Sequence, residues 1–284
     1  MNIKEIKSIE LSSFTTSITG IATLFSIIAV IIISAFLALL VPGTESLIIY
    51  LIPTVIVGTL MYTIYSSFCE GFLYNILTKK LKTVAISIED NKIVKISTTE
   101  TAIIVAIITT IQAILLYLVS VLILPITLTS IMQTLMLTGQ QTLAYSIYQF
   151  VMIISQPTTI LLMIFAVFIV TFVFTLIGAD IYNIIAKRGR CVELELSENN
   201  GLTQIDSLNS LKVAIVCAII FGIFGIITGI LNIVSGGSIS TLFGHVLGGF
   251  VGGFIEAYLF CVFYNFLAGK LDKIKLELID LKIN

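Results

Sequence analysis

Six long apolar stretches constrain the fold of this chain more than any other feature of its sequence. They lie at about 17–41, 48–73, 101–124, 158–185, 211–234 and 243–268. A helix needs roughly 20 mainly apolar residues to cross the hydrocarbon core of a bilayer. Charged residues make up only 11% of the chain, well below the share that is usual in soluble domains. The sequence therefore predicts an all-α polytopic membrane protein with six transmembrane helices.

The distribution of positive charge predicts the orientation of these spans. All lysine and arginine residues lie at 1–10, 79–95, 187–212 and 270–284, and the alternate connections carry none. Because cytoplasmic loops carry an excess of lysine and arginine, we expect both termini in the cytoplasm and the chain in the plasma membrane. The net charge of −1 does not favour nucleic acid as a partner, and the lipid bilayer is the expected one.

The connection at 125–157 is longer than its counterparts and carries no charge. Its apolar residues fall at i, i+3, i+4, i+7 and i+8, which is a helical stripe: Leu128, Ile131, Met132, Leu135 and Met136. This pattern predicts an amphipathic segment at 126–150 that lies on the outer leaflet or packs over the helices. A lid or a re-entrant pore helix is the functional alternative.

Internal repetition is the most specific feature of the sequence. The dipeptide Tyr-Asn occurs three times, each time near the end of an even-numbered span: Tyr74 and Asn75, Tyr182 and Asn183, Tyr264 and Asn265. The residues 10, 12 and 14 positions after each tyrosine are apolar: Val84, Ile86 and Ile88, then Val192, Leu194 and Leu196, then Ile274, Leu276 and Leu278. A period of two predicts a half-buried strand in each case, which we name the trailing strand.

A second short segment precedes each odd-numbered span, and we name it the leading strand. The three segments are Ile6–Leu11, Ile93–Thr98 and Leu202–Ser207, in which Ile9, Ile96 and Ile205 are taken as equivalents. The predicted unit is strand, span, span, strand, repeated at 1–91, 92–199 and 200–284 and joined by turns at 89–92 and 198–201. The three units together are expected to form one membrane domain.

This arrangement leaves the first leading strand and the last trailing strand without a neighbour along the chain. If the units surround a pseudo-threefold axis, these two strands can pair and close a six-stranded ring. Closure would remove exposed sheet edges, which are prone to aggregation. We therefore predict a small closed β cap on the cytoplasmic side.

Each unit resembles a family of small, uncharacterised two-span bacterial membrane proteins, best known from actinobacteria, that end in Tyr-Asn, a short linker and a strand. The third unit is the most similar. Its segment 205–212 looks like the family's leading signature, and Tyr264-Asn265 followed by Ile274, Leu276 and Leu278 looks like its end. The resemblance implies the fold of the unit, and the family brings no established activity.

The Tyr-Asn pair has two interpretations. The structural one places tyrosine at the lipid headgroups and asparagine in the left-handed conformation that can end a helix. The functional one is recognition of headgroups or of a protein partner by three equivalent helix ends.

Four ionisable residues lie inside the apolar stretches: Glu70, Asp180, His245 and Glu256. Glu256 lies 14 residues before Lys270, which is about 21 Å along a helix and close to the middle of the bilayer. An ionisable group at that depth suggests proton or ion handling, or a neutral contact between helices. Glu70 and Asp180 lie nearer to the first lysine after their spans, and His245 lies near the outer interface.

The remaining candidates are glycines and cysteines. Small residues four apart predict close helix packing within the protein, or a face for a second copy: Gly225, Gly229, Gly244, Gly248 and Gly252, with Gly249 and Gly253 beside them. The four cysteines, Cys69, Cys191, Cys217 and Cys261, are far apart and predict neither a metal site nor a disulfide.

The sequence carries no catalytic or nucleotide-binding signature, so we expect no enzyme activity, cofactor or metal. We favour a non-enzymatic membrane scaffold or assembly protein, with protein partners at the strands and a homo-oligomer as a further possibility. The alternative is a small channel or transporter along the pseudo-threefold axis, with Glu256 as the ion-handling group. The three acids occupy different offsets from the tyrosines, which argues against a symmetric acidic ring.

Overall fold

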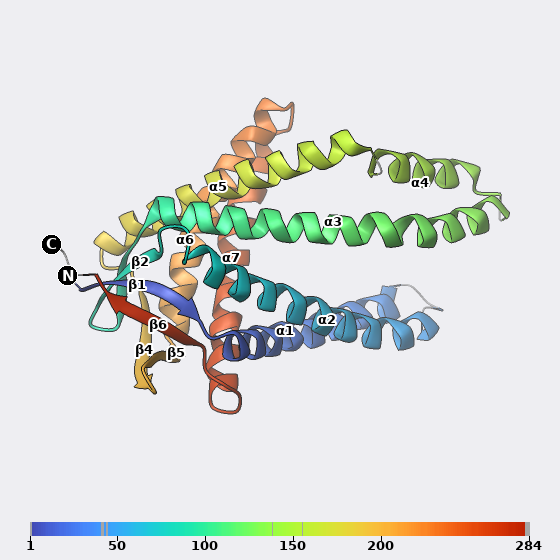
Figure 1. The fold of residues 1–284 in the computed structure, drawn as a ribbon. Coiled ribbons are helices and arrows are strands. Elements are labelled where there is room, and N and C mark those ends of the chain that lie inside the picture. Colours follow the sequence, from blue (N-terminus) through green and yellow to red (C-terminus); the bar gives the residue numbers. More distant parts are fainter. Residues whose placement is uncertain (1, 41–42, 44, 138, 155, 282–284) are drawn as a thin grey trace. The chain divides into compact units, whose positions relative to one another are not determined.

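The structure, a computed structural model, describes residues 2–40, 43, 45–137, 139–154 and 156–281. Within these residues the chain forms seven helices and six strands (Figure 1). Their bounds are β1 (Asn2–Ile9), α1 (Leu11–Leu40), α2 (Glu45–Leu77), β2 (Val84–Glu89), β3 (Lys92–Ile96), α3 (Thr98–Leu137), α4 (Gln141–Ile154), α5 (Pro157–Lys187), β4 (Val192–Asn199), β5 (Leu202–Leu208), α6 (Ser210–Val234), α7 (Ile239–Ala268) and β6 (Lys275–Asp280).

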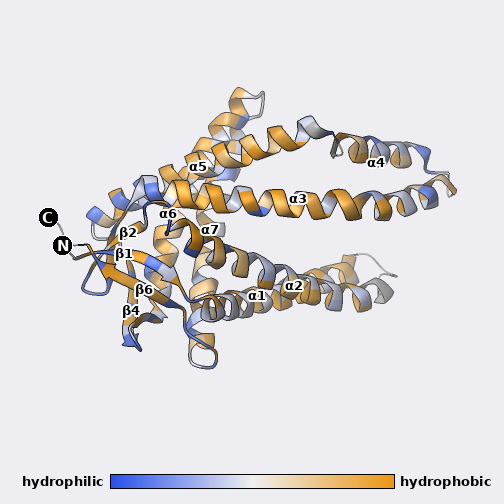
Figure 2. Ribbon diagram, viewed as in Figure 1, coloured by the Kyte–Doolittle hydropathy of each residue, from blue (hydrophilic) through white to orange (hydrophobic). Residues whose placement is uncertain are grey.

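In this part of the chain, six helices are long and apolar enough to cross a membrane: α1, α2, α3, α5, α6 and α7. Apolar residues dominate these helices, and hydrophilic residues gather at the strands and turns (Figure 2). The helices extend beyond the predicted spans toward the strands. For example, α1 begins at Leu11, six residues before the predicted span, because its first turns carry serines and threonines that lower the hydropathy. The prediction of six helices with the length and composition of membrane spans is confirmed.

The predicted amphipathic segment at 126–150 is not one separate helix. Its apolar stripe forms the last turns of α3, which runs through Pro125 to Leu137, and α4 follows from Gln141. Proline inside a helix removes one backbone hydrogen bond, but transmembrane helices tolerate this where other groups satisfy the freed backbone. The carbonyl that loses its helical donor here is that of Val121, and in the next turn the Thr129 hydroxyl donates to the carbonyl of Pro125 at 2.5 Å. The placement of the segment on the outer leaflet stays a prediction.

The chain divides into two compact units, Met1–Glu100 with Gly178–Asn284, and Thr101–Ile177. The first unit holds the described strands, helices α1, α2, α6 and α7, and the ends of α3 and α5 that adjoin the strands. The second unit holds α4 and most of α3 and α5. The proposed repeat boundaries at 91/92 and 199/200 both fall in turns of the first unit, and the division into three repeats stays a prediction.

The described strands form a closed antiparallel barrel in the order β1-β2-β3-β4-β5-β6. The closing pair joins the two ends of the chain, and Glu5 in β1 lies opposite Ile279 in β6. This confirms the predicted pairing of the first leading strand with the last trailing strand. Because each strand has a neighbour on both sides, the barrel leaves no open sheet edge.

The turns between consecutive strands have the chemistry that their backbone requires. In the turn between β2 and β3, Asp90 and Asn91 have φ angles of 46° and 61°. Positive φ at both central residues defines the hairpin turn whose twist matches that of the strands, and aspartate and asparagine tolerate it. Asn200 and Gly201 repeat this pattern between β4 and β5, with φ angles of 52° and 78°.

Apolar clusters join the barrel to the helices of the first unit. One contains the buried residues Ile21 of α1 with Tyr264 and Ala268 of α7. Beside it, the rings of Phe25 and Phe263 meet edge to face with their centroids 5.0 Å apart, a favourable aromatic geometry. These contacts hold the end of α7 against α1, next to the closing pair of strands.

Candidate functional site

The three tyrosines of the Tyr-Asn pairs lie at the junction between helix and barrel, and their side chains are 7%, 5% and 1% exposed in chain order. Each hydroxyl donates to a carbonyl of the leading strand: Tyr74 to Ile6 at 2.6 Å, Tyr182 to Ile93, and Tyr264 to Ile205 at 2.5 Å. Each hydroxyl also accepts from an N–H at the start of the trailing segment: Val84, Val192 and Ile274. The oxygen therefore lies between the two strands and bonds to both.

The third pair shows most clearly what the hydroxyl replaces. The N–H of Ile205 donates directly to the carbonyl of Ile274 at 3.0 Å. The return bond passes through the Tyr264 hydroxyl, which is 3.3 Å from the nitrogen of Ile274 and 2.5 Å from the oxygen of Ile205. A side chain from the helix thus supplies one link of the β ladder, and buried backbone groups that would otherwise lack a partner are satisfied.

Each asparagine binds both backbone groups of one residue at the end of the leading strand. The side-chain oxygen accepts from the N–H and the side-chain nitrogen donates to the carbonyl of the same residue: Asn75 with Ile9, Asn183 with Ile96, and Asn265 with Leu208. All six distances are 2.8 or 2.9 Å. The planar amide acts as a further strand partner, so we name each tyrosine and asparagine together a Tyr-Asn clamp.

The clamps correct the sequence interpretation in two ways. The asparagines lie inside helices and none has a positive φ, so they do not end a helix in the left-handed conformation. The tyrosines are buried between strands rather than placed at an exposed interface. The buried and hydrogen-bonded groups of the clamps hold helix and barrel together, and their hydroxyls and amides already have partners within the chain.

The clamps also correct the alignment of the leading strands. Ile205 bonds to tyrosine, as Ile6 and Ile93 do, whereas Leu208 bonds to asparagine, as Ile9 and Ile96 do. The predicted equivalence of Ile9, Ile96 and Ile205 is therefore wrong by three residues in the third strand. Residue type does not identify this position, because the asparagine amide binds only backbone groups and does not distinguish leucine from isoleucine.

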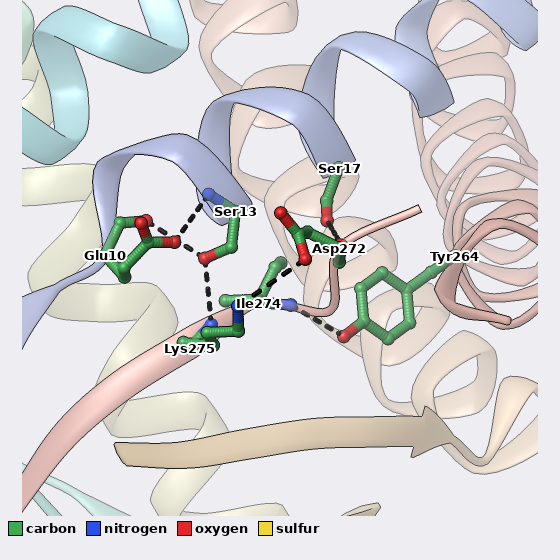
Figure 3. A network of polar contacts seen from close by, with 7 residues as sticks. All are labelled: Glu10, Ser13, Ser17, Tyr264, Asp272, Ile274 and Lys275. Carbon is green, nitrogen blue, oxygen red and sulfur yellow. Dashed lines mark hydrogen bonds and ion pairs between the residues drawn. The ribbon is translucent and has the colours of Figure 1, made fainter. Parts of the chain in front are cut away.

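The closing strand β6 is fixed at its start by α1 (Figure 3). The Ser17 hydroxyl donates to the carbonyl of Asp272 at 2.7 Å, and the N–H of Lys275 donates to the Ser13 hydroxyl at 3.2 Å. The carboxylate of Glu10 accepts from the N–H of Ser13 at 2.7 Å. Burial raises the pKa of Glu10, but the hydrogen bonds from Ser13 and the charge of Lys275 outweigh it and leave this pKa below the usual value.

Ion pairs connect β6, or the segment that leads into it, to the strands on both sides. Lys273 lies 2.7 Å from Asp206, and Lys7 lies 3.0 Å from Glu277. The hydrogen bond from Lys273 holds the pKa of Asp206 below its usual value. The hydrogen bonds from Ser8 and Lys7 do the same for the pKa of Glu277. Such partly exposed pairs contribute little stability individually, so the clamps and the ladder carry more of it.

The four ionisable residues of the apolar stretches lie on three helices and differ in exposure. Glu256 and His245 are exposed on α7, and Glu70 is half-buried on α2. Asp180 is exposed on α5, two residues before a clamp tyrosine, and lines a cleft beside the barrel. Among the residues that the structure describes, no group of three or more His, Cys, Asp or Glu side chains could hold a metal ion. The cysteines are all free.

The glycines divide into two sets. A Cβ atom built on Gly225 would lie 2.3 Å from the carbonyl oxygen of His245, and one on Gly249 would lie 2.4 Å from that of Phe221. Gly229 and Gly253 are similarly close to side chains of the opposite helix, so α6 and α7 approach through this set. Gly244, Gly248 and Gly252 lie on α7, and a Cβ atom there would meet nothing within 4 Å.

Sequence reasoning missed the serines that fix the closing strand and most of the charged residues around the cleft. Glu10, Ser13 and Ser17 recur at helical spacing around the start of the first apolar stretch, a signal that could have identified a polar face on the first turns of α1. Lys95 and Glu100 are close in sequence, but Lys187 lies almost 90 residues further along the chain, and only the fold of the barrel brings the three to one cleft.

Comparison of the chain with models of protein families, with curated proteins and with solved structures gives no match.

Proposed function

We propose that this chain is a non-enzymatic membrane scaffold in which a closed β-barrel carries three helical hairpins. The observation that carries the proposal is the recurrence of the same clamp at the ends of α2, α5 and α7. The tyrosine hydroxyl groups, which could otherwise take part in binding or catalysis, join helices to strands there. This favours a rigid platform that presents helices and strand turns to partners.

The proposal includes a threefold internal repeat related to the two-span bacterial family that the units resemble. It is supported by the equal spacing within the clamps, since the leading carbonyl and the asparagine partner are three residues apart in each strand. A two-span relative would then complete the same barrel as a homotrimer. We place the barrel and both termini in the cytoplasm, on the basis of the lysine and arginine distribution.

An ion or proton pathway is the second candidate, favoured by the exposed carboxyl group of Glu256 in the apolar helix α7. The two functions make opposite predictions for purified protein in liposomes. A scaffold gives no proton or potassium flux above that of empty liposomes, both for the native chain and for Glu256→Gln. Flux that Glu256→Gln abolishes would refute the scaffold and establish the pathway.

A second experiment tests the scaffold directly. A photo-reactive amino acid at Glu198, an exposed residue at the far end of β4, should cross-link to a defined membrane protein in cells. The cross-link should be lost when Tyr264→Ala opens the barrel, and retained in Tyr258→Ala, which removes an exposed tyrosine of the same helix. No cross-link from the native chain at any exposed strand turn would contradict the proposal.

A further inference from the structure

A cleft of about 620 Å³ opens between the side of the barrel and the end of α5, within the first compact unit. Its floor is a row of register partners across three strands, Ile3 in β1, Ser87 in β2 and Lys95 in β3. Its wall is one face of α5, where Asp180 and Lys187 lie two turns apart. Asn183 on the same face is clamped to Ile96, so the wall is fixed relative to the floor.

The cleft gathers two cations and two anions that lack ion pairs. Lys95 and Lys187 line it together with Glu100 and Asp180. None of the four forms an ion pair with another described residue, although lysines elsewhere on the barrel do. Because the charges are balanced, the cleft suits a ligand that carries both signs better than a simple anion or cation.

A buried hydroxyl group lies in the floor of the same cleft. The Ser87 side chain is 2% exposed, and its oxygen has no hydrogen-bond partner among the described residues. Burying a hydroxyl without a partner costs free energy, so such groups usually have a role. Beside Lys95, this hydroxyl is placed to donate to an oxygen of a bound anionic group.

The position of the cleft along α5 indicates the source of the ligand. Asp180 is seven residues before the last residue of this helix, which is roughly 10 Å along its axis. Ile184, which also lines the cleft, is 56% exposed. The cleft therefore lies where an apolar helix meets the polar barrel, which is the level of the phospholipid headgroups.

We propose that this cleft binds the headgroup of a zwitterionic phospholipid that carries a primary ammonium group. Lys95, Lys187 and the Ser87 hydroxyl bind the phosphate, and Asp180 and Glu100 bind the ammonium group. Quaternary ammonium groups are typically bound by aromatic rings, and the residues that line the cleft include none. A primary ammonium group instead donates hydrogen bonds to carboxylates. This site is independent of the proposed scaffold function.

The two carboxylates differ in their value for a test. Glu100 lies in the first turn of α3, where the helix dipole stabilises a carboxylate whether or not a ligand is bound. Asp180 has no such role and is exposed, so Asp180→Asn leaves the fold intact. Lys187→Gln tests the phosphate side. Its matched control is Lys79→Gln, because Lys79 also follows a clamp tyrosine by five residues but does not line the cleft.

The experiment is native mass spectrometry of the full-length protein in detergent with equal concentrations of phosphatidylethanolamine, phosphatidylcholine and phosphatidylglycerol. We expect the native chain to retain phosphatidylethanolamine about fivefold more strongly than either other lipid, the scale of one partly exposed ion pair. Asp180→Asn should abolish this preference, Lys187→Gln should weaken retention, and Lys79→Gln should change neither.

Several results would overturn the proposal. Equal retention of phosphatidylethanolamine and phosphatidylcholine would exclude recognition of the primary ammonium group. Retention of phosphatidylglycerol at the level of phosphatidylethanolamine would mean that the lysines act alone. An unchanged preference in Asp180→Asn would place the lipid elsewhere. Free phosphoethanolamine that displaces the lipid at equal concentration would identify a soluble ligand instead of a lipid.

Discussion

Replacing Tyr264 by phenylalanine removes one oxygen atom from the most buried clamp and leaves the ring in place. That oxygen donates to the carbonyl of Ile205 at 2.5 Å and accepts from the N–H of Ile274 at 3.3 Å. A buried backbone group that loses its partner costs about 1–3 kcal/mol. The accepted bond is long and contributes less, so we expect Tyr264→Phe to lower the free energy of unfolding by about 2–3 kcal/mol.

The assay is reversible unfolding in mixed detergent micelles, followed by circular dichroism. The matched control is Tyr258→Phe, because Tyr258 is on the same helix but is 40% exposed. The control should stay within about 0.5 kcal/mol of the native chain. Amide exchange at Ile274 should also accelerate in Tyr264→Phe only. A loss below about 0.5 kcal/mol for Tyr264→Phe would refute the reasoning that the hydroxyl completes the β ladder.

Two further predictions concern helix packing and pH. Gly225→Ala should lower the free energy of unfolding by about 1–3 kcal/mol, because its methyl group would lie 2.3 Å from a backbone oxygen of α7. Gly248→Ala should be neutral or slightly stabilising, because nothing lies within 4 Å of the added methyl group. Equal thermal midpoints of the two variants in detergent would contradict this. The pKa values of Asp206 and Glu277 are lowered in the folded state. Their contribution to the free energy of unfolding is therefore present above about pH 4, near which carboxyl groups of the unfolded chain titrate. This contribution is lost as the pH falls through the lower pKa values of the folded state. Thermal midpoints measured from pH 7 to pH 3 should therefore fall at the acidic end, and less so in Asp206→Asn.

Much of this fold could be predicted, because membrane spans and half-buried strands leave patterns in residues that are adjacent in the sequence. A span needs a long apolar run, and a half-buried strand needs alternation, so both can be read from adjacent residues. The closing pair of β1 and β6 was also predictable, because three repeated units leave one unpaired strand at each end. The turns at Asp90-Asn91 and Asn200-Gly201 follow from the residue types that tolerate positive φ.

The chemistry of the clamps could not be read in the same way. The Tyr-Asn dipeptide marks the helix ends in the sequence, but its hydrogen bonds go to backbone atoms, which have no identity in the sequence. A tyrosine near the end of a span is therefore easily assigned to the headgroup interface, although Tyr264 is 1% exposed. Similarly, the apolar stripe after Pro125 fits a separate helix as well as a continuation of α3, so the sequence does not show that α3 runs on to Leu137.

The cleft beside the barrel could not be predicted from the sequence for a different reason. Its charges come from β3, the first turn of α3 and the end of α5, and about 90 residues separate Lys95 from Lys187. Only the order of strands in the barrel brings them together. The sequence marks Asp180 as an acid inside an apolar stretch, but it does not reveal the neighbours of Asp180 in space.

The two ends of one chain close the barrel, and disulfide cross-linking tests this closure most directly. Glu5 and Ile279 are register partners in the closing pair, whereas Leu276 lies opposite Ile9. With the natural cysteines replaced by alanine, Glu5→Cys with Ile279→Cys should form an intramolecular disulfide in membranes under mild oxidation. Glu5→Cys with Leu276→Cys should not. Failure of the first pair to link, equal linking of both pairs, or a link between two chains would contradict the closed barrel.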